Sequence, residues 1–291
     1  MASNNLRVIY NNLADTATIT VSSTASATTV AANLKSDYKS VVWRSAAGTS
    51  AAIIVQLSSS SVVRGIVLGF NNLTTAATVR VKGYSAQPTF SGGTITGGTS
   101  NGMDSGLVIA NPPANLGSFN LGGNTVLGTS AYEIRRGYAR VWIPAGISCA
   151  FIGIEIVDSG NTDNYIEVSR LIFGDYWSPQ YNTSFGLSST LNDTSTSERN
   201  EAGDIITNNG TQYNTVSFDM KYMSPADRTD FNKLIRTKGS RYPVFISLFP
   251  DNAEDYGKEQ LHQVFGKLTK ISGISHPIFN MYATQVDIEE I

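Results

Sequence analysis

The sequence predicts a mainly β protein in which an N-terminal β-sandwich is followed by an α+β unit of sheet and helix. A chain of 291 residues exceeds what one hydrophobic core usually organises, so we expect two folded units. Short segments rich in Val, Ile, Thr and aromatic residues recur throughout, and only one segment has a clear helical signature. Charge also divides the chain. Residues 1–132 hold three acidic side chains and residues 133–291 hold the other twenty. We therefore predict units at 1–175 and 176–291.

The first unit is predicted to consist almost entirely of strands. Each segment is separated from the next by Gly, Asn, Ser or Pro, which break strands. In residues 77–84 polar and apolar side chains alternate, so that one face can be buried while Arg80 and Lys82 face water. The segments are 18–21, 51–57, 62–70, 77–84, 139–143, 151–157 and 165–173.

The second unit carries a helix predicted over residues 225–238. Ser224 is suited to the N-cap, Pro225 to the first helical position, and Asp227 can complete a capping box. Gly239 is suited to end the helix in the left-handed region. Strand-like segments surround this helix at 185–191, 215–222, 243–249, 263–271 and 279–288. Because strands and helix do not alternate, an α+β arrangement is favoured.

Composition limits the partners of the chain. Charged residues are 15% of the total and the net charge is −2, so no positive field is available to attract nucleic acid. No segment approaches the ~20 continuous apolar residues of a membrane span, and the amino terminus lacks a secretory signal, so we expect the chain to stay in, or assemble from, the cytoplasm. Cys149 is the only cysteine, which excludes an internal disulfide.

The sequence predicts no catalytic residue, no cofactor and no metal site, and hence a protein that is not an enzyme. His262 and His276 are the only histidines, and neither has a nucleophile or acid nearby in the sequence. Two histidines and one cysteine cannot supply the common structural zinc ligands. Ser100, between Gly98 and Gly102, matches a nucleophile-elbow string but lacks the flanking strand and helix. The glycine doublets in this stretch lack the Lys-Ser/Thr of a phosphate-binding loop.

Three features remain as possible contact sites. Residues 158–164, with Glu167 beyond them, are rich in Asp and Asn, which indicates a turn first and a calcium loop second. Residues 87–128 form a Gly- and Ser-rich stretch that is predicted to be a long loop, the most suitable place for this unit to touch a partner. Trp43, Arg44 and Tyr84 are candidate glycan contacts, although a Trp beside two valines is more often part of a core.

The first unit resembles the discoidin-like jelly roll, also called galactose-binding-like. The resemblance is one of pattern over roughly residues 35–175. It is carried by 42–45, 52–57, 62–71 and 165–171. It implies a jelly-roll sandwich, and such folds serve many functions, so recognition of sugar does not follow from the fold alone.

The second unit resembles proteins of the tail tip of tailed bacteriophages, in particular the ring-forming belt domain of distal tail proteins. About 115 residues take part, through 174–179, 201–204, and the helix, turn and strand from Ser224 to Pro250. Distal tail proteins usually place the ring domain first, whereas here it comes second, and a related baseplate or tail-tip ring protein fits equally. The resemblance implies a homo-oligomeric ring, with six subunits, that contacts tube, hub and fibre proteins in the virion.

Two hypotheses follow. In the first, the chain is a structural protein of a phage tail tip or baseplate, whose strands near 215–222 and 279–288 join neighbouring subunits. In the second, it is a lectin-like adhesion module that recognises glycans of a host surface through its N-terminal unit. A cell-wall hydrolase is disfavoured because no paired carboxylates stand in a recognisable setting.

Overall fold

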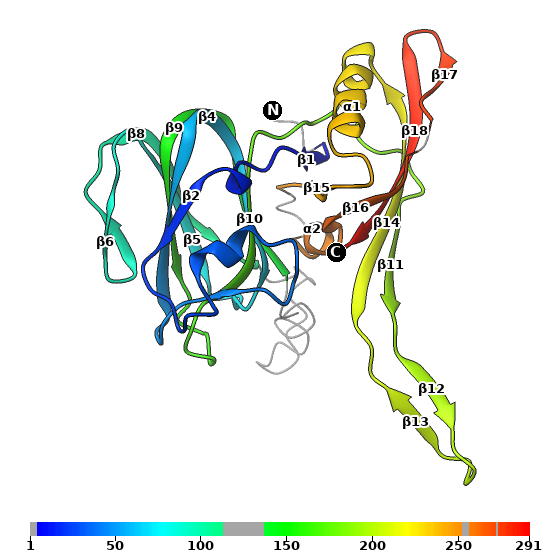
Figure 1. Ribbon diagram of the computed structural model, residues 1–291. Helices are drawn as coiled ribbons and strands as arrows, with labels where there is room; N and C mark the ends of the chain where they lie inside the picture. The colour runs from blue at the N-terminus through cyan, green and yellow to red at the C-terminus, as the bar shows by residue number, and fades with distance from the viewer. Residues whose placement is uncertain (1–4, 113–136, 252–255, 272) are drawn as a thin grey trace, which may run out of the picture.

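The computed structural model describes residues 5–112, 137–251, 256–271 and 273–291, and the predicted fold class is confirmed. Two seven-stranded antiparallel sheets make up most of the described chain (Figure 1). We call the first the sandwich sheet and the second the arm sheet. The sandwich sheet contains β2 (Thr18–Val21), β3 (Trp43–Arg44), β4 (Ser50–Asn71), β5 (Thr78–Tyr84), β8 (Ser100–Ile109), β9 (Gly137–Val157) and β10 (Glu167–Gly174).

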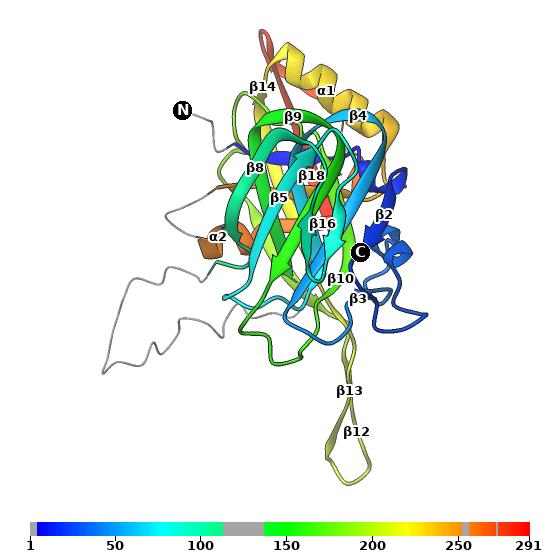
Figure 2. The same cartoon turned by 90° about the vertical axis from the view of Figure 1, so that its left-hand side faces the viewer.

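The sandwich sheet curls over its own core because two very long strands run through both of its layers (Figure 2). β4 and β9 pair along almost their whole length, with register shifts between Gln56 and Ser61 and between Val63 and Gly65. The sequence predicts two strands in each of these regions, and the structure joins each pair into one because the pairing continues through the bend. The core between the layers includes Ile53, Leu68, Ile154 and Phe173, all fully buried.

The arm sheet is covered on one face by the predicted helix. α1 (Pro225–Thr237) begins with the capping box between Ser224 and Asp227, and Gly239 follows it with a φ of +53°. Phe231 and Leu234 of α1 pack on apolar side chains of the sheet. The arm sheet contains β1 (Arg7–Ile9), β11 (Ser188–Asp193), β14 (Gln212–Met223), β15 (Val244–Ser247), β16 (Gln263–Ile271), β17 (Ser275–Ile278) and β18 (Met281–Glu290).

The other face of the arm sheet packs against the sandwich along part of its width. The cluster at this seam joins Val67, Phe70 and Tyr138 of the sandwich sheet to Phe245 and Phe265 of the arm sheet. β1 connects the two units a second time. It pairs with β15 of the arm sheet, and the chain then continues from it into the sandwich sheet. β1 thus belongs to the arm sheet although it precedes the sandwich sheet in the sequence, and the other strands of the arm sheet follow residue 175.

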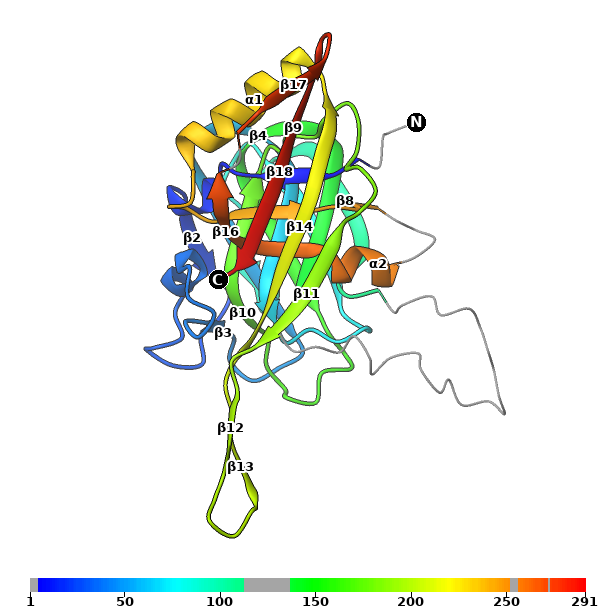
Figure 3. The ribbon, with the colours of Figure 1, turned by 90° about the vertical axis from the view of Figure 1, so that its right-hand side faces the viewer.

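Smaller elements complete the fold. Strands β12 (Thr196–Arg199) and β13 (Ile205–Asn208) form a hairpin, the arm, which projects away from both units (Figure 3). Strands β6 (Thr89–Ser91) and β7 (Thr94–Thr96) pair with each other, and β8 follows, so the prediction of a loop is wrong over 89–109; its remainder at 113–128 lies outside the described residues. Ile95 is buried against Ala52 and Tyr84, which explains how so short an apolar segment is held. Helix α2 (Tyr256–Leu261) and the 3-10 turns η1 (Leu13–Asp15) and η2 (Ala31–Lys35) were not predicted.

Candidate functional site

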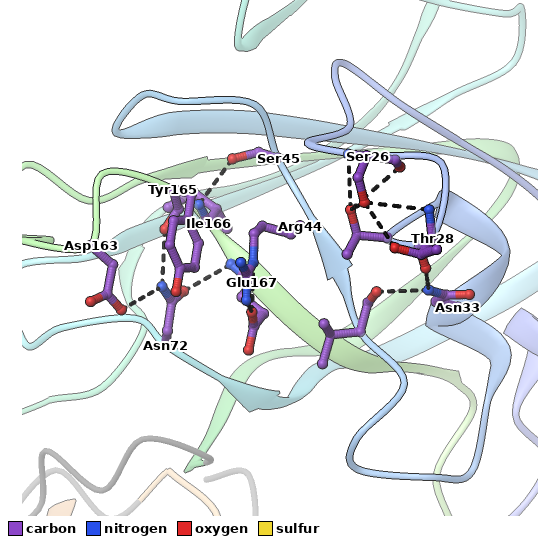
Figure 4. A network of polar contacts seen from close by, with 12 residues as sticks. Ser26, Thr28, Asn33, Arg44, Ser45, Asn72, Asp163, Tyr165, Ile166 and Glu167 are labelled. Atoms are coloured by element: carbon purple, nitrogen blue, oxygen red, sulfur yellow. Dashed lines mark hydrogen bonds and ion pairs between the residues drawn. The ribbon is translucent and has the colours of Figure 1, made fainter.

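A cluster of polar side chains lies where β3 pairs with the start of β10, and we call it the β3–β10 network (Figure 4). Arg44 and Glu167 are direct cross-strand partners in this pairing. Arg44 donates to Glu167 Oε2 from Nε at 2.9 Å and from Nη2 at 2.6 Å. The pair is partly exposed, with side-chain accessibilities of 38% and 24%. It thus presents a fixed charge pair to solvent, with guanidinium donors left over.

Tyr165 completes the pair with an aromatic ring. The guanidinium carbon of Arg44 lies 4.2 Å from the centre of this ring, a cation–π geometry. The hydrogen bond to Glu167 raises the pKa of Arg44 further above its ordinary value, so the group is charged at every physiological pH. The guanidinium is therefore held from two sides, by a carboxylate and by a ring.

Asn72, just after β4, fixes the backbone around this pair. Its side chain donates to Tyr165 O at 3.0 Å and to Asp163 Oδ2 at 3.3 Å, and its Oδ1 accepts from Glu167 N at 2.8 Å. On the other side, Ser45 Oγ accepts from Ile166 N at 2.9 Å. Segments far apart in the sequence thereby converge, which makes the arrangement rigid before any ligand arrives.

The neighbouring turn at 158–164 is organised by its own side chains. Asp158 is fully buried and accepts from Thr74 N at 2.8 Å and from Thr74 Oγ1 at 2.6 Å. Asn161 Oδ1 accepts from Asp163 N at 2.8 Å, and Asn164 has a φ of +56°. Both features are those of an Asx-type turn. Among the residues that the structure describes, no group of three His, Cys, Asp or Glu side chains is arranged to hold a metal ion.

Of the three candidate glycan contacts, only Arg44 is open to solvent. Trp43 is fully buried in the sandwich core, where its Nε1 donates to Ser23 O at 3.1 Å. Tyr84 is 5% exposed and packs with Ile54 and Ile95 in a separate cluster. As placed, neither ring offers a face to a ligand, because apolar neighbours cover both. The aromatic residue beside Arg44 is instead Tyr165.

The sequence alone did not single out Asn72 or Tyr165 as site residues, and it indicated Glu167 only as an oxygen ligand beyond the possible calcium loop. Tyr165 and Glu167 stand in the segment that carries the jelly-roll resemblance, which was the available signal. Their pairing with Arg44 spans more than 120 residues and depends on the register of β3 with β10. No local pattern encodes that register.

The side chains that could in principle act as catalysts lie in surroundings typical of structural residues. Ser100 begins β8, and no helix follows it, so the nucleophile-elbow context is missing. His262 packs edge-on against Phe249 at 5.2 Å, and His276 stacks on Tyr282 at 4.6 Å. Burial raises the pKa of the Cys149 thiol to about 11, which keeps it protonated at neutral pH. No described helix is both long and apolar enough to cross a membrane.

The two strands expected to join subunits lie inside the arm sheet. β14 lies between β18 and β11, and β18 lies between β16 and β14. β18 is therefore paired on both edges, whereas β14 pairs with β11 only over 212–217, so the β11-side edge of β14 from Phe218 onward has no strand partner among the described residues. Exposed apolar residues do occur near the β17–β18 end of this region, namely Tyr222, Ile278 and Phe279.

Comparisons with known proteins find similarity only among solved structures. No protein-family model matches the chain, and no curated protein matches it. A chitosan-binding module of a chitosanase/glucanase from Paenibacillus sp. IK-5 is 17% identical and has a TM-score of 0.38, with 57% of this chain and 99% of the module covered. The family 32 carbohydrate-binding module of Clostridium perfringens NanJ, solved with galactose, is 11% identical with a TM-score of 0.33, and 57% and 98% are covered.

A third similar structure is a much longer protein. A Ruminococcus gnavus GH29 fucosidase, solved with fucose, is 13% identical with a TM-score of 0.37, and the match covers 58% of this chain and 27% of the fucosidase. TM-scores below 0.5 carry no inference about ligand or activity for this chain. The candidate site therefore has to be judged on its own geometry.

Proposed function

We propose that this chain is a non-catalytic binding protein whose sandwich recognises neutral glycans through the β3–β10 network. The observation that carries the proposal is the Arg44–Glu167 pair beside Tyr165. A guanidinium and a carboxylate fixed next to one another offer donors and acceptors to neighbouring sugar hydroxyls. Since the two charges offset each other, the site does not favour an anionic ligand.

The surroundings of the pair support a binding role. Asn72 and Ser45 hold the backbone on either side of it, so little ordering remains to be done when a ligand binds. Loops on a rigid sandwich are a common place for recognition. Contacts of this kind need no nucleophile or metal.

Binding can be tested by titrating the full chain with galactose, fucose and triacetylchitotriose, all of them neutral, followed by NMR or calorimetry. We expect saturable binding of at least one sugar that falls about tenfold or more in Arg44→Gln and in Tyr165→Ala, through loss of charge-assisted hydrogen bonds and of the ring. Arg80→Gln is the matched control, because Arg80 pairs with Asp104 on the same sandwich at a similar exposure of 37%. Equal binding by all the variants, or no binding by the parent chain, would refute this site.

A second candidate function, a ring-forming structural protein of a phage tail tip or baseplate in the virion, is favoured by the arm. Ile205 and Ile206 of β13 are 60% and 61% exposed, and as successive strand residues they face opposite sides of the arm. An isolated two-stranded hairpin is marginally stable in water, so an arm with apolar residues on both faces is suited to packing against another chain.

The test of this second function is the oligomeric state. Analytical ultracentrifugation and electron microscopy of the purified chain are expected to show closed rings, six subunits by the resemblance, that dissociate in the double variant Ile205→Ser/Ile206→Ser. The variant Thr207→Val, in the same strand, is the control for folding of the arm. A parent chain that stays monomeric at high concentration and does not join other tail proteins would refute the assembly function but leave the glycan proposal standing.

A further inference from the structure

A groove between the two units forms a second candidate site, separate from the β3–β10 network. It lies at the base of the arm, where the arm sheet extends past the seam with the sandwich, and its volume is about 840 Å³. Pockets of this size accommodate small molecules and short oligomers. Its lining includes Tyr138, Leu191, Gln260, Leu261, Gln263 and Glu290.

Gln263 is the unusual residue of this groove. It opens β16 and lies on the same face of the strand as Phe265, which packs against the sandwich. Gln263 is only 2% exposed, yet neither its Nε2 nor its Oε1 has a hydrogen-bond partner among the residues that the structure describes. The Nε2 of Gln260, from α2, is also buried without a partner in the described part of the chain. A buried polar group left unpaired costs about 1–3 kcal/mol, and native structures keep few of them.

The charged side chains of the same groove are, by contrast, satisfied. Glu290 accepts from the Tyr138 hydroxyl at 2.8 Å and from Asn214 N at 3.0 Å, and it pairs with Lys39 at 3.2 Å. Asp193 accepts from Ser195 N at 2.8 Å and from Gln212 Nε2 at 2.9 Å. Unmet hydrogen-bonding capacity is therefore concentrated in neutral amides, and a charged ligand would find its counterpart already paired.

A carboxamide presents one acceptor and one donor side by side. Two adjacent hydroxyl groups of a pyranose match this arrangement, since each hydroxyl can donate or accept. The nearby Leu191 and Leu261 are 61% and 49% exposed and can contact the C–H faces of such a ring. Beside Gln263, β16 is paired on one edge only, with β15, because its pairing with β18 begins at Gly266. A peptide that added a strand at the other edge would pair through its backbone and would leave the buried carboxamides without partners.

We propose that this groove binds a neutral saccharide, with Gln263 and Gln260 hydrogen-bonded to adjacent sugar hydroxyls. The proposal goes beyond the function assigned to the β3–β10 network, because it concerns different residues on a different part of the molecule. A chain with both sites would hold a polysaccharide at two points, which raises its avidity.

The test is saturation-transfer NMR and calorimetry on the full chain with cellotriose, maltotriose and lactose, and with the blocked peptide acetyl-trialanine-amide. We expect at least one saccharide to bind the Arg44→Gln variant, in which the β3–β10 network is disabled. In the double variant Arg44→Gln/Gln263→Met, which keeps the length of the side chain but removes the amide, this binding should fall about tenfold or more. Gln285→Met in the same background is the control, because Gln285 is exposed on the same sheet outside the groove.

Three results would overturn the proposal. The first is saccharide binding that Gln263→Met leaves unchanged. The second is the absence of saccharide binding in the Arg44→Gln background, which would mean that water satisfies the buried amides. The third is binding of the peptide in preference to every saccharide. Because Arg44→Gln is present throughout, failure of this site and failure of the β3–β10 network give different results. Thermal unfolding of each variant shows whether a loss of binding reflects a loss of fold.

Discussion

The β3–β10 network and the inter-unit groove differ in how their polar groups are satisfied. Around Arg44 the hydrogen bonds run between protein groups, from Glu167 through Asn72 to Tyr165. At Gln263 the amide is buried and has no partner within residues 5–112, 137–251, 256–271 and 273–291. The first arrangement contributes to the stability of the fold, and the second costs stability. A ligand at the β3–β10 network would therefore add hydrogen bonds to groups that already have partners. A ligand in the groove would supply partners that the buried amides lack.

The variant Phe265→Ala, at the seam, is expected to cause the largest loss of stability and to affect the two sites differently. Phe265 is 2% exposed, its ring packs near Phe70, and its N–H donates to the Tyr138 hydroxyl at 3.0 Å. Truncating a buried Phe typically costs about 3–5 kcal/mol, because apolar burial is lost and a cavity remains. Chemical denaturation should show this loss, and the variant should lose saccharide binding at the groove, one wall of which Phe265 supports.

The sandwich has its own core, so binding at Arg44 should survive wherever the Phe265→Ala protein is still folded. Phe279→Ala is the control, since Phe279 is 84% exposed and its removal should change the free energy of unfolding by less than about 0.5 kcal/mol. If both variants were equally stable, the seam would not hold the units together.

A smaller change is expected from one substitution at each site. The free energy of unfolding should change in opposite directions, or not fall at all at the groove. Gln263→Met removes an unpaired buried amide and should leave the free energy of unfolding unchanged or raise it by about 1–3 kcal/mol. Arg44→Gln removes one partner of a pair that is about one-third exposed, and should lower it by no more than about 1 kcal/mol. Denaturation curves of the two variants measure both values. A clear loss of stability in Gln263→Met would contradict the view that its amide lacks a partner.

What could be predicted from the sequence was local. The capping box of α1, the Gly239 stop and most strand positions depend on neighbouring residues, and the structure confirms them. The pairing of β1 with β15, the joining of strand pairs into β4 and β9, and the seam cluster depend on which distant segments meet. Periodicity indicates that a face is buried, but not what covers it.

The candidate sites show the same limit. Arg44 was a candidate from the sequence, but its partners Glu167 and Tyr165 follow only from strand register. Trp43 was an equally prominent candidate in the sequence. It is buried in the core because its large apolar surface is stabilised more by burial than by contact with solvent. Gln263 carried no signal at all, because a glutamine becomes unusual only when it is buried without a partner.

The smallest effect concerns two aspartates whose pKa is lowered to about 2 for different reasons. In Asp193, at the groove, hydrogen bonds from the Gln212 amide and from Ser195 lower the pKa. In Asp104, on the sandwich, the main cause is the hydrogen bond from the charged Arg80. In both cases the folded pKa lies below the unfolded value near 3.8, so each contribution to stability is complete above that pH and is lost as the pH falls through about 2.

Salt should separate the two causes. In 1 M NaCl the screening length is about 3 Å, so the pKa of Asp104 should rise toward its ordinary value while that of Asp193, held by neutral donors, changes little. Carboxyl-carbon NMR titrations at low and high salt measure both shifts, and Gln212→Leu should raise the pKa of Asp193 alone. If salt moved both groups equally, Asp193 would depend on the field of distant cations, and the charge at the groove would not be set by its own neutral side chains.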